Sequence, residues 1–386
     1  MLVLIAVLGA LDAAIVLPVP RVGDWYQFWH AGRIVASGGS PYDPSAWSLA
    51  AQEAEVVENV VNAVRLNCSE PASAACRWLY PPWTALVLAP FGALPAALGL
   101  PLLAVAVIAA GLGSLFLLFR RFPPPPAAPT LPLAMALAAQ PLVLATRTGH
   151  LDALLLIGAM LVIPGLRGST LSLVAGALLL SLKPHLFIAF AVIVVAVLVW
   201  RRRWSAIAIT SGTVLSLAAA SFARFPLPEA WLANAAGRVS FDVPAIWALA
   251  SAWLPEAQSV VVVALLLFAT VLAGVALSGS HADRDALLVA TGLGLSLVSA
   301  PYEHTYDHVL LLPAVVLMIE IAARLRPFAR ATWLAAATAI GVLYPWIAYF
   351  ADFVVGNQLP SALVPISTLA GLAAVTVAAR TAPDSA

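Results

Sequence analysis

Asp24 is the first residue in this sequence that could do acid–base chemistry. It follows an apolar N-terminal stretch, and aromatic residues come directly after it: Trp25, Tyr26, Phe28 and Trp29. Aromatic rings provide flat platforms for sugar faces, and a carboxylate beside them can accept the proton of an alcohol, as a general base does. The alternative is a structural role for Asp24, either as a helix cap or as a partner of Arg33.

Lys183 is a second candidate, because it is the sole lysine among 386 residues. It lies in the segment "LKPH", next to Pro184 and His185. The ammonium group is a compact charge that favours an anionic oxygen where the dielectric is low. Lys183 and His185 are therefore candidate ligands of a phosphate. The alternative is a lysine that extends to the membrane surface and binds nothing.

Two further short segments concentrate polar side chains. The segment "TRTGHLD" carries Arg147, His150 and Asp152. The segment "PYEHTYDH" carries Tyr302, Glu303, His304, Tyr306, Asp307 and His308. His304 and His308 have the i, i+4 spacing of zinc ligands on a helix, but the partner motif of a zinc protease is absent, so no metal is predicted. No Gly-rich phosphate loop, Ser-His-Asp order or nucleotide fingerprint is found, so neither a nucleotide donor nor a cofactor is predicted.

Composition shows what must position these residues. The chain is 62% hydrophobic and 10% charged, with a mean hydropathy of +0.99, whereas soluble domains carry roughly 25% charged residues. Continuous apolar runs predict spanning helices rather than a barrel. The expected fold class is all-α, as a polytopic membrane protein that forms a single domain over residues 1–386. A net charge of +1 without a basic tract argues against nucleic acid and favours lipids or lipid-linked molecules as partners.

About twelve spans are predicted from the apolar runs. They are 2–20, 95–119, 131–147, 150–166, 169–182, 185–200, 205–222, 257–277, 286–299, 308–323, 331–350 and 361–379. The N-terminal run has no basic start and no small-residue cleavage site, so it is interpreted as a retained first span rather than a secretion signal.

Basic clusters predict the orientation of the chain in the membrane. They fall on alternate connections and comprise Arg120, Arg121, Arg167, Arg201 to Arg203, Arg284, Arg324, Arg326, Arg330 and Arg380. The positive-inside rule makes these connections cytoplasmic. Residues 21–81 and 223–256 then form the extracytoplasmic loops of a protein of the inner (plasma) membrane.

The first extracytoplasmic loop has its own pattern. Asp43 and Pro44 are a helix start, and the valines that follow recur at helical spacing, which predicts an interfacial amphipathic helix. Cys68 and Cys76 lie in the same loop and either form a disulfide or remain free thiols. The later segment 223–256 contains several tryptophans and is expected to be a second interfacial element.

The polar segments are expected to meet on the extracytoplasmic side, although they come from separate spans. Such a site suits transfer from a lipid-phosphate donor. Lys183 and Arg147 would stabilise the negative charge of the departing phosphate, and Asp24 would take the proton of the attacking hydroxyl. Arg33 and Tyr26 complete the candidate substrate-binding set.

The order of these segments resembles glycosyltransferase family 87, a GT-C family that includes polyprenyl-phosphate-mannose-dependent α-mannosyltransferases. The resemblance covers roughly residues 20–315 and is carried by "DWYQFWHAGRIVASGGSPYD", "YPPWTALVLAPFGALP", "GHLDALLLIGAMLV", "LKPH" followed by "RRRW", and "PYEHTYD". It implies a GT-C-like fold and an inverting transfer with Asp24 as the catalytic aspartate. It also implies that Lys183 and residues Tyr302 to His308 line the donor site. Gly149-His150-Leu151 departs from the Gly-Gln-Asn that the family usually shows.

The expected function is therefore a membrane glycosyltransferase. It would move a hexose from polyprenyl phosphate to a hydroxyl of a glycolipid or glycan in the cell envelope, and the expected hexose is mannose. A multi-span transporter or lipid-linked sugar flippase is the alternative from another class, because spans with buried charge also suit substrate passage. A non-catalytic assembly subunit is the third.

Overall fold

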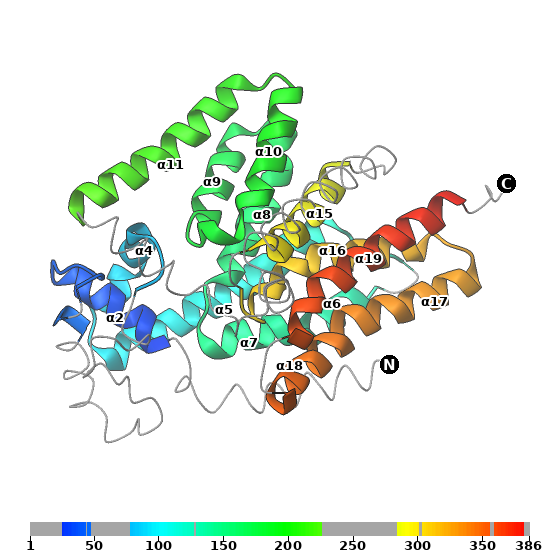
Figure 1. The fold of residues 1–386 in the computed structure, drawn as a ribbon, viewed down its shortest axis with the longest axis horizontal. Helices are drawn as coiled ribbons and strands as arrows, with labels where there is room; N and C mark the ends of the chain where they lie inside the picture. The colour runs from blue at the N-terminus through cyan, green and yellow to red at the C-terminus, as the bar shows by residue number, and fades with distance from the viewer. Residues whose placement is uncertain are drawn as a thin grey trace, which may run out of the picture.

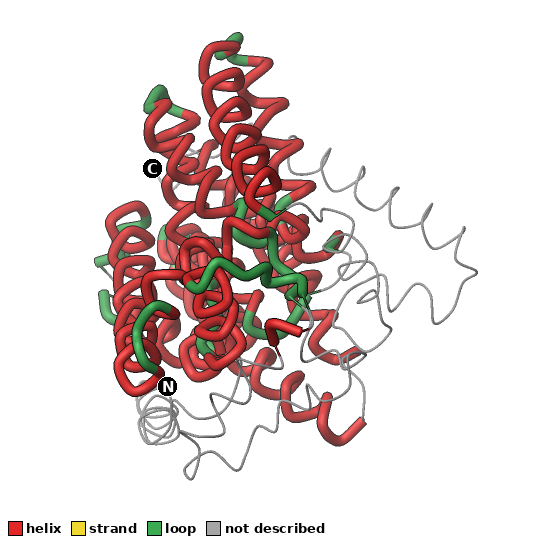
Figure 2. The backbone as a smooth tube through the Cα atoms, turned by 90° about the vertical axis from the view of Figure 1, so that its left-hand side faces the viewer, coloured by secondary structure: helices red, strands yellow, loops and turns green. Residues whose placement is uncertain are grey.

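The computed structural model describes residues 25–43, 45–47, 78–126, 129–225, 284–300, 303–355 and 359–381. Every regular element in these ranges is a helix, and Figure 2 shows them as a stack of helices joined by short loops. The predicted all-α class is confirmed for this part of the chain. The predicted spans 2–20 and 257–277, most of the helix after Asp43, both cysteines and most of 223–256 lie outside it.

The helices follow one another along the chain with short connections between most neighbours. They are α2 (Trp25–Ala36), α4 (Pro82–Gly92), α5 (Ala96–Arg121), α6 (Leu131–Ala138), α7 (Gln140–Thr148), α8 (Asp152–Leu166), α9 (Thr170–Leu180), η2 (Pro184–Leu186), α10 (Ile188–Trp200), α11 (Trp204–Arg224), α15 (Arg284–Ser299), η3 (Asp307–Leu311), α16 (Leu312–Ala323), α17 (Pro327–Thr338), the π-helical turn η4 (Ala339–Leu343), α18 (Tyr344–Val355) and α19 (Leu359–Thr381).

Membrane-spanning character is found in four helices of the described part of the chain. They are long and apolar enough to cross a bilayer: Ala96–Arg121, Trp204–Arg224, Pro327–Asp352 and Pro360–Thr381. Three shorter apolar helices are Asp152–Leu166, Thr170–Leu180 and Ile188–Trp200. These helices make the chain a membrane protein by length and composition.

One predicted span is broken in the structure. Hydropathy predicts a single helix over 131–147, but α6 ends at Ala138 and α7 begins at Gln140. In a continuous helix the ring of Pro141 would clash with the carbonyl of Leu137, and the backbone turns instead at Ala139, whose ψ is 117°. The indole of Trp346 donates to the carbonyl of Ala138 at 2.9 Å, so this carbonyl at the end of α6 has a hydrogen-bond partner.

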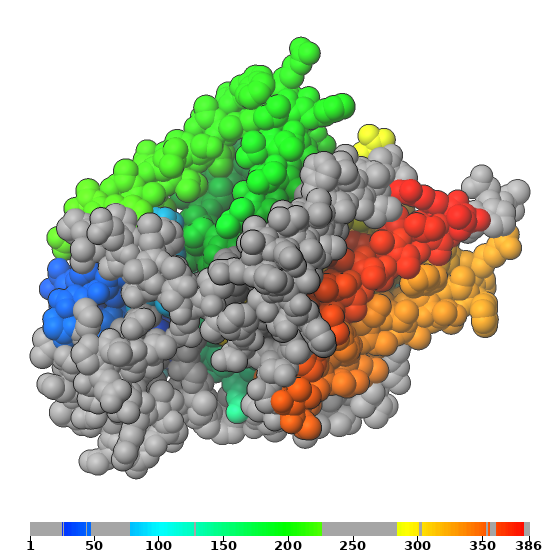
Figure 3. All heavy atoms as spheres, in the orientation of Figure 1, coloured from blue at the N-terminus to red at the C-terminus, as the bar shows by residue number. Residues whose placement is uncertain are grey.

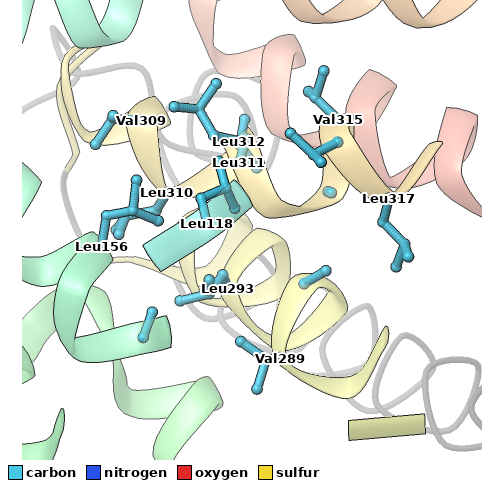
Figure 4. Packing of buried hydrophobic residues seen from close by; sticks show 14 of the residues in the cluster. Leu118, Leu156, Val289, Leu293, Val309, Leu310, Leu311, Leu312, Val315 and Leu317 are labelled. Carbon is cyan, nitrogen blue, oxygen red and sulfur yellow. The ribbon is translucent and has the colours of Figure 1, made fainter. Parts of the chain in front are cut away.

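The main core lies where α5, α8, α15 and α16 meet. Figure 4 shows Leu118, Leu156, Leu293 and Leu310 pointing toward one another from four different elements. Each of these side chains is at most 1% exposed. The packing places η3 and the start of α16 against the middle of the bundle, and it therefore fixes the segment that precedes them.

A second core joins α2 and α4 at one end of the molecule, opposite α17 and the C-terminal end of α19 (Figures 1 and 3). Gly32 and Gly92 allow the two helices to touch. A Cβ at Gly32 would lie 2.4 Å from the carbonyl oxygen of Leu88, and one at Gly92 would lie 2.0 Å from the backbone nitrogen of Arg33. The start of the predicted first loop is thus a helix, α2, that packs on α4, which follows that loop.

The two ends of α8 and α10 differ in charge. At one end, Arg201 Nη2 lies 2.5 Å from Asp285 Oδ1, and Arg167 Nε lies 3.5 Å from Asp285 Oδ2. Arg167 caps α8, Arg201 caps α10, and Asp285 is in the first turn of α15. This is the end that carries the predicted cytoplasmic arginines. The opposite end of α8, roughly 22 Å away for its 15 residues, carries the polar segments.

Candidate functional site

Lys183 is the centre of a buried ionic cluster. Its Nζ donates to Asp152 Oδ1 and to Asp307 Oδ1, at 2.8 Å each. All three side chains are at most 3% exposed. Segments far apart in the chain therefore meet at one ammonium group.

Local backbone chemistry places each member of the cluster. α7 stops at Gly149, which adopts the left-handed conformation (φ 82°), and α8 then starts at Asp152. Lys183 precedes Pro184 and is held out of the helical region (φ −135°, ψ 68°), as the residue before a proline prefers. Asp307 starts η3, and its Oδ2 accepts a hydrogen bond from the backbone of His304 at 2.8 Å.

The three charges of the cluster lie close enough to act on one another. Burial alone would lower the pKa of Lys183, but the Asp152 and Asp307 carboxylates outweigh it and hold that pKa well above its usual range. The rings of Tyr80 and Tyr306 lie 5.7 and 4.9 Å from Nζ, within the range of cation–π attraction. The ammonium is therefore charged and enclosed.

Aromatic stacking ties the cluster to its surroundings. His150 stacks on Tyr306 with ring centroids 3.5 Å apart. His304 lies 5.0 Å from the same tyrosine ring, and Phe28 of α2 lies 5.7 Å from His150. The turn before α8, the turn before η3 and helix α2 thus form one wall.

Trp25 brings the start of α2 to the same wall. Its indole donates to the carbonyl of Arg147 at 2.8 Å, and its ring fills the space above Gly149. Asp24, the covalent neighbour of Trp25, lies outside the described residues, as do Tyr302 and the side chain of Tyr26. The predicted base is thus attached directly to a residue that contacts the site.

The remaining predicted residues divide by exposure and position. His150, Asp307 and His308 are 1 to 2% exposed, whereas Arg147, His185, His304 and Tyr306 are half-buried, and we call these four the rim residues. Arg33 is in the last turn of α2, about 12 Å along the helix axis from Trp25, so α2 does not place it beside Trp25.

Glu303 and His308 form a second buried pair next to Asp307. Glu303 Oε1 lies 3.4 Å from His308 Nε2, and both side chains are 1% exposed. Burial, reinforced by Asp307, raises the pKa of Glu303 well above its usual range, which favours the neutral acid. Among the residues that the structure describes, no group of His, Cys, Asp and Glu is arranged to hold a metal ion.

Sequence reasoning missed two features of the site. It did not pair Lys183 with any acid, and it assigned Tyr80 no role. The signal for the first was present, because a lone lysine within an apolar bundle requires countercharges, and Asp152 and Asp307 are acids at the ends of neighbouring spans.

Replacing Gly149 with alanine is expected to disturb this wall. A Cβ there would lie 2.3 Å from the Trp25 ring, and the residue would keep a φ of +82°. The backbone strain alone is about 1 to 2 kcal/mol, and Trp25 must move. We expect a lower midpoint of thermal unfolding and slower turnover. Gly212→Ala is the matched control, because nothing lies within 4 Å of its added Cβ; equal behaviour of the two variants would contradict the prediction.

Comparison with known proteins finds a family match over part of the chain. Residues 78–241 match the family model described as glycosyltransferase family 87, which confirms, over those residues, the resemblance that the sequence motifs indicate. The matched segment includes Asp152 and Lys183 and ends before Asp307. No curated protein and no solved structure matches the chain.

Proposed function

We propose that this chain, a member of glycosyltransferase family 87 by the match over residues 78–241, transfers a hexose from polyprenyl phosphate to a hydroxyl of a glycolipid or glycan. The family and the spanning helices make it a membrane glycosyltransferase. The lipid-phosphate donor, mannose as the sugar, and inversion at the anomeric carbon are the proposed refinements.

The observation that carries the proposal is the single polar site at one end of an apolar bundle, within the part of the chain that the structure describes. Lys183, Asp152 and Asp307 are its buried members, and the rim residues Arg147, His185 and His304 are half-buried. Polar groups are costly within a bilayer and are retained where they act. A lipid-linked donor can reach such a site sideways from the membrane, with its chain in lipid and its phosphate at the rim.

The proposed reaction is a single displacement. The acceptor hydroxyl oxygen attacks the anomeric carbon, the bond from that carbon to the phosphate oxygen breaks, and its electron pair stays on the phosphate. Arg147 and the rim histidines stabilise the charge of the leaving phosphate. Asp24 takes the proton of the hydroxyl. Attack from the face opposite the leaving group inverts the anomeric centre.

Lys183 contributes to the donor site indirectly, through its bonds to Asp152 and Asp307. Both of its carboxylate partners lie at 2.8 Å, so two of the three N–H donors of Nζ are already used and the two carboxylates offset its charge. Arg147 is half-buried and therefore more accessible to an incoming phosphate than Lys183, which is 2% exposed. We therefore assign the first phosphate contact to Arg147, and we assign to Lys183 the positioning of the Asp152 and Asp307 segments.

The site is proposed to face the extracytoplasmic side. It lies at the end of α8 opposite the arginines that surround Asp285, and the positive-inside rule puts those arginines in the cytoplasm. The inner (plasma) membrane is the proposed location.

A donor assay tests the proposed function. Purified protein in nanodiscs would be incubated with polyprenyl-phosphate mannose and a panel of membrane glycolipids, and products would be identified by mass spectrometry. A glycolipid gaining one hexose, with release of polyprenyl phosphate, is expected. Movement of the intact donor between the leaflets of proteoliposomes, without any hexosylated product, would overturn the proposal in favour of a flippase.

A further inference from the structure

An apolar groove lies between α5 and α6, at a distance from the candidate site. Its volume is about 620 Å³, and it is lined by Leu112, Leu115, Phe116, Phe119, Arg120, Leu133 and Leu137. Phe116 is 64% exposed and Leu137 is 48% exposed. We call this feature the α5–α6 groove.

The groove has one charged residue among its described lining, and that residue is at its end. Arg120 is in the last turn of α5 and is exposed, and no acid is among the lining residues. α5 is the most apolar of the four candidate spans in the described part of the chain. The groove therefore runs from a cationic membrane boundary into the hydrocarbon layer.

The short length of α6 explains the groove. α6 has only 8 residues before the break at Ala139, whereas α5 has 26. Leu133 and Leu137 of α6 line the groove together with residues of the last turns of α5. The side chains of α5 and α6 do not fill the space between the two helices, and no other described part of the chain fills it.

From these features we infer that the α5–α6 groove binds an anionic phospholipid, with an acyl chain between the helices and the phosphate at Arg120. Tail packing alone contributes little preference, because the surrounding lipid is as apolar as the groove. Selectivity must come from the charge at the boundary. An anionic headgroup complements Arg120, because no acid is among the lining residues of the groove.

A phospholipid fits this location better than the lipid-linked donor. Arg121, the neighbour of Arg120, interacts electrostatically with Arg167, Glu320 and Asp285, so the groove opens at the arginine-rich end of the bundle. The Lys183 cluster is at the other end of α8. The inference is thus independent of the proposed catalytic function.

Lipid titration followed by native mass spectrometry tests the inference. Full-length protein in detergent would be titrated with phosphatidylglycerol or phosphatidylcholine, and bound lipid would be counted. Arg120→Gln is expected to weaken phosphatidylglycerol binding about fivefold, the equivalent of ~1 kcal/mol for one basic residue at an anionic lipid surface, with phosphatidylcholine binding unchanged. Arg326→Gln is the matched control, because Arg326 is exposed and is not part of the groove.

A second variant tests the groove itself and keeps the charge. Leu137→Trp fills the space beside Phe116, so we expect weaker phosphatidylglycerol binding although Arg120 remains. Equal losses in Arg120→Gln and Arg326→Gln would overturn the inference, and so would wild-type binding by Leu137→Trp. Polyprenyl phosphate that binds in an Arg120-dependent manner where phosphatidylglycerol does not would also overturn it.

Discussion

Lys183→Met is expected to lower both the stability and the activity of the protein. The substitution leaves the Asp152 and Asp307 carboxylates buried beside each other without the ammonium that bonds both at 2.8 Å. Breaking a buried ion pair by removing one partner costs about 3 to 5 kcal/mol, and here two acids lose their partner. Thermal unfolding in detergent should show a large fall in the midpoint, accompanied by loss of glycosyl transfer.

Two further variants show whether the loss of stability comes from the unpaired buried charges. The triple variant Lys183→Met, Asp152→Asn, Asp307→Asn removes all the charges together, so we expect it to recover much of the stability. Arg324→Met is the control for loss of an exposed cation. It breaks a surface pair with Glu320, in which Arg324 is 59% exposed, and such pairs contribute about 0.3 to 0.5 kcal/mol. A Lys183→Met protein as stable as Arg324→Met would show that the buried cluster does not stabilise the fold.

Asp24→Asn is expected to reduce the rate of transfer about 10²- to 10⁴-fold, the usual contribution of a general base. The amide keeps the size of the side chain but cannot accept the proton of the acceptor hydroxyl. Binding of the donor should remain, because the proposed phosphate ligands are on other segments. Single-turnover rates and donor affinity, measured separately, check both expectations.

The control for Asp24 is another acid close to it in the sequence. Asp43 is exposed and accepts a hydrogen bond from the backbone of Ser45 at 2.9 Å, so Asp43→Asn should transfer sugar at the wild-type rate. Equal product from Asp24→Asn and Asp43→Asn would remove Asp24 from the mechanism and leave the donor assay to judge the function.

The helices were predictable from the sequence where apolar runs were long and cleanly ended. The predicted span 95–119 corresponds to α5 (Ala96–Arg121) and 205–222 to α11 (Trp204–Arg224). Hydropathy could not find the break at Ala139, because that break depends on a backbone clash at Pro141. It also could not find the packing of α2 on α4, which depends on two glycines 60 residues apart in sequence, at 32 and 92.

The candidate site was predictable as a set of residues but not as a network. Polar residues in an apolar chain identified Arg147, Lys183 and Asp307, and the structure brings their segments together. Composition cannot show which of these residues bond to one another, whereas the distances in the structure do. In the sequence, Lys183 is a candidate phosphate ligand. In the structure, its ammonium already bonds two carboxylates, which would compete with a phosphate for its charge.

The three members of the Lys183 cluster are made at different times during protein synthesis. Asp152 and Lys183 are 31 residues apart, and Asp307 follows Lys183 by 124 residues. At about 5 to 20 residues per second, the nascent chain waits on the order of 6 to 25 s for the third member. During that interval a one-to-one pair of Asp152 and Lys183 is electrically neutral. The helices around it can thus enter the bilayer early without exposing a bare charge to lipid, and the later helices complete a site that is already half assembled.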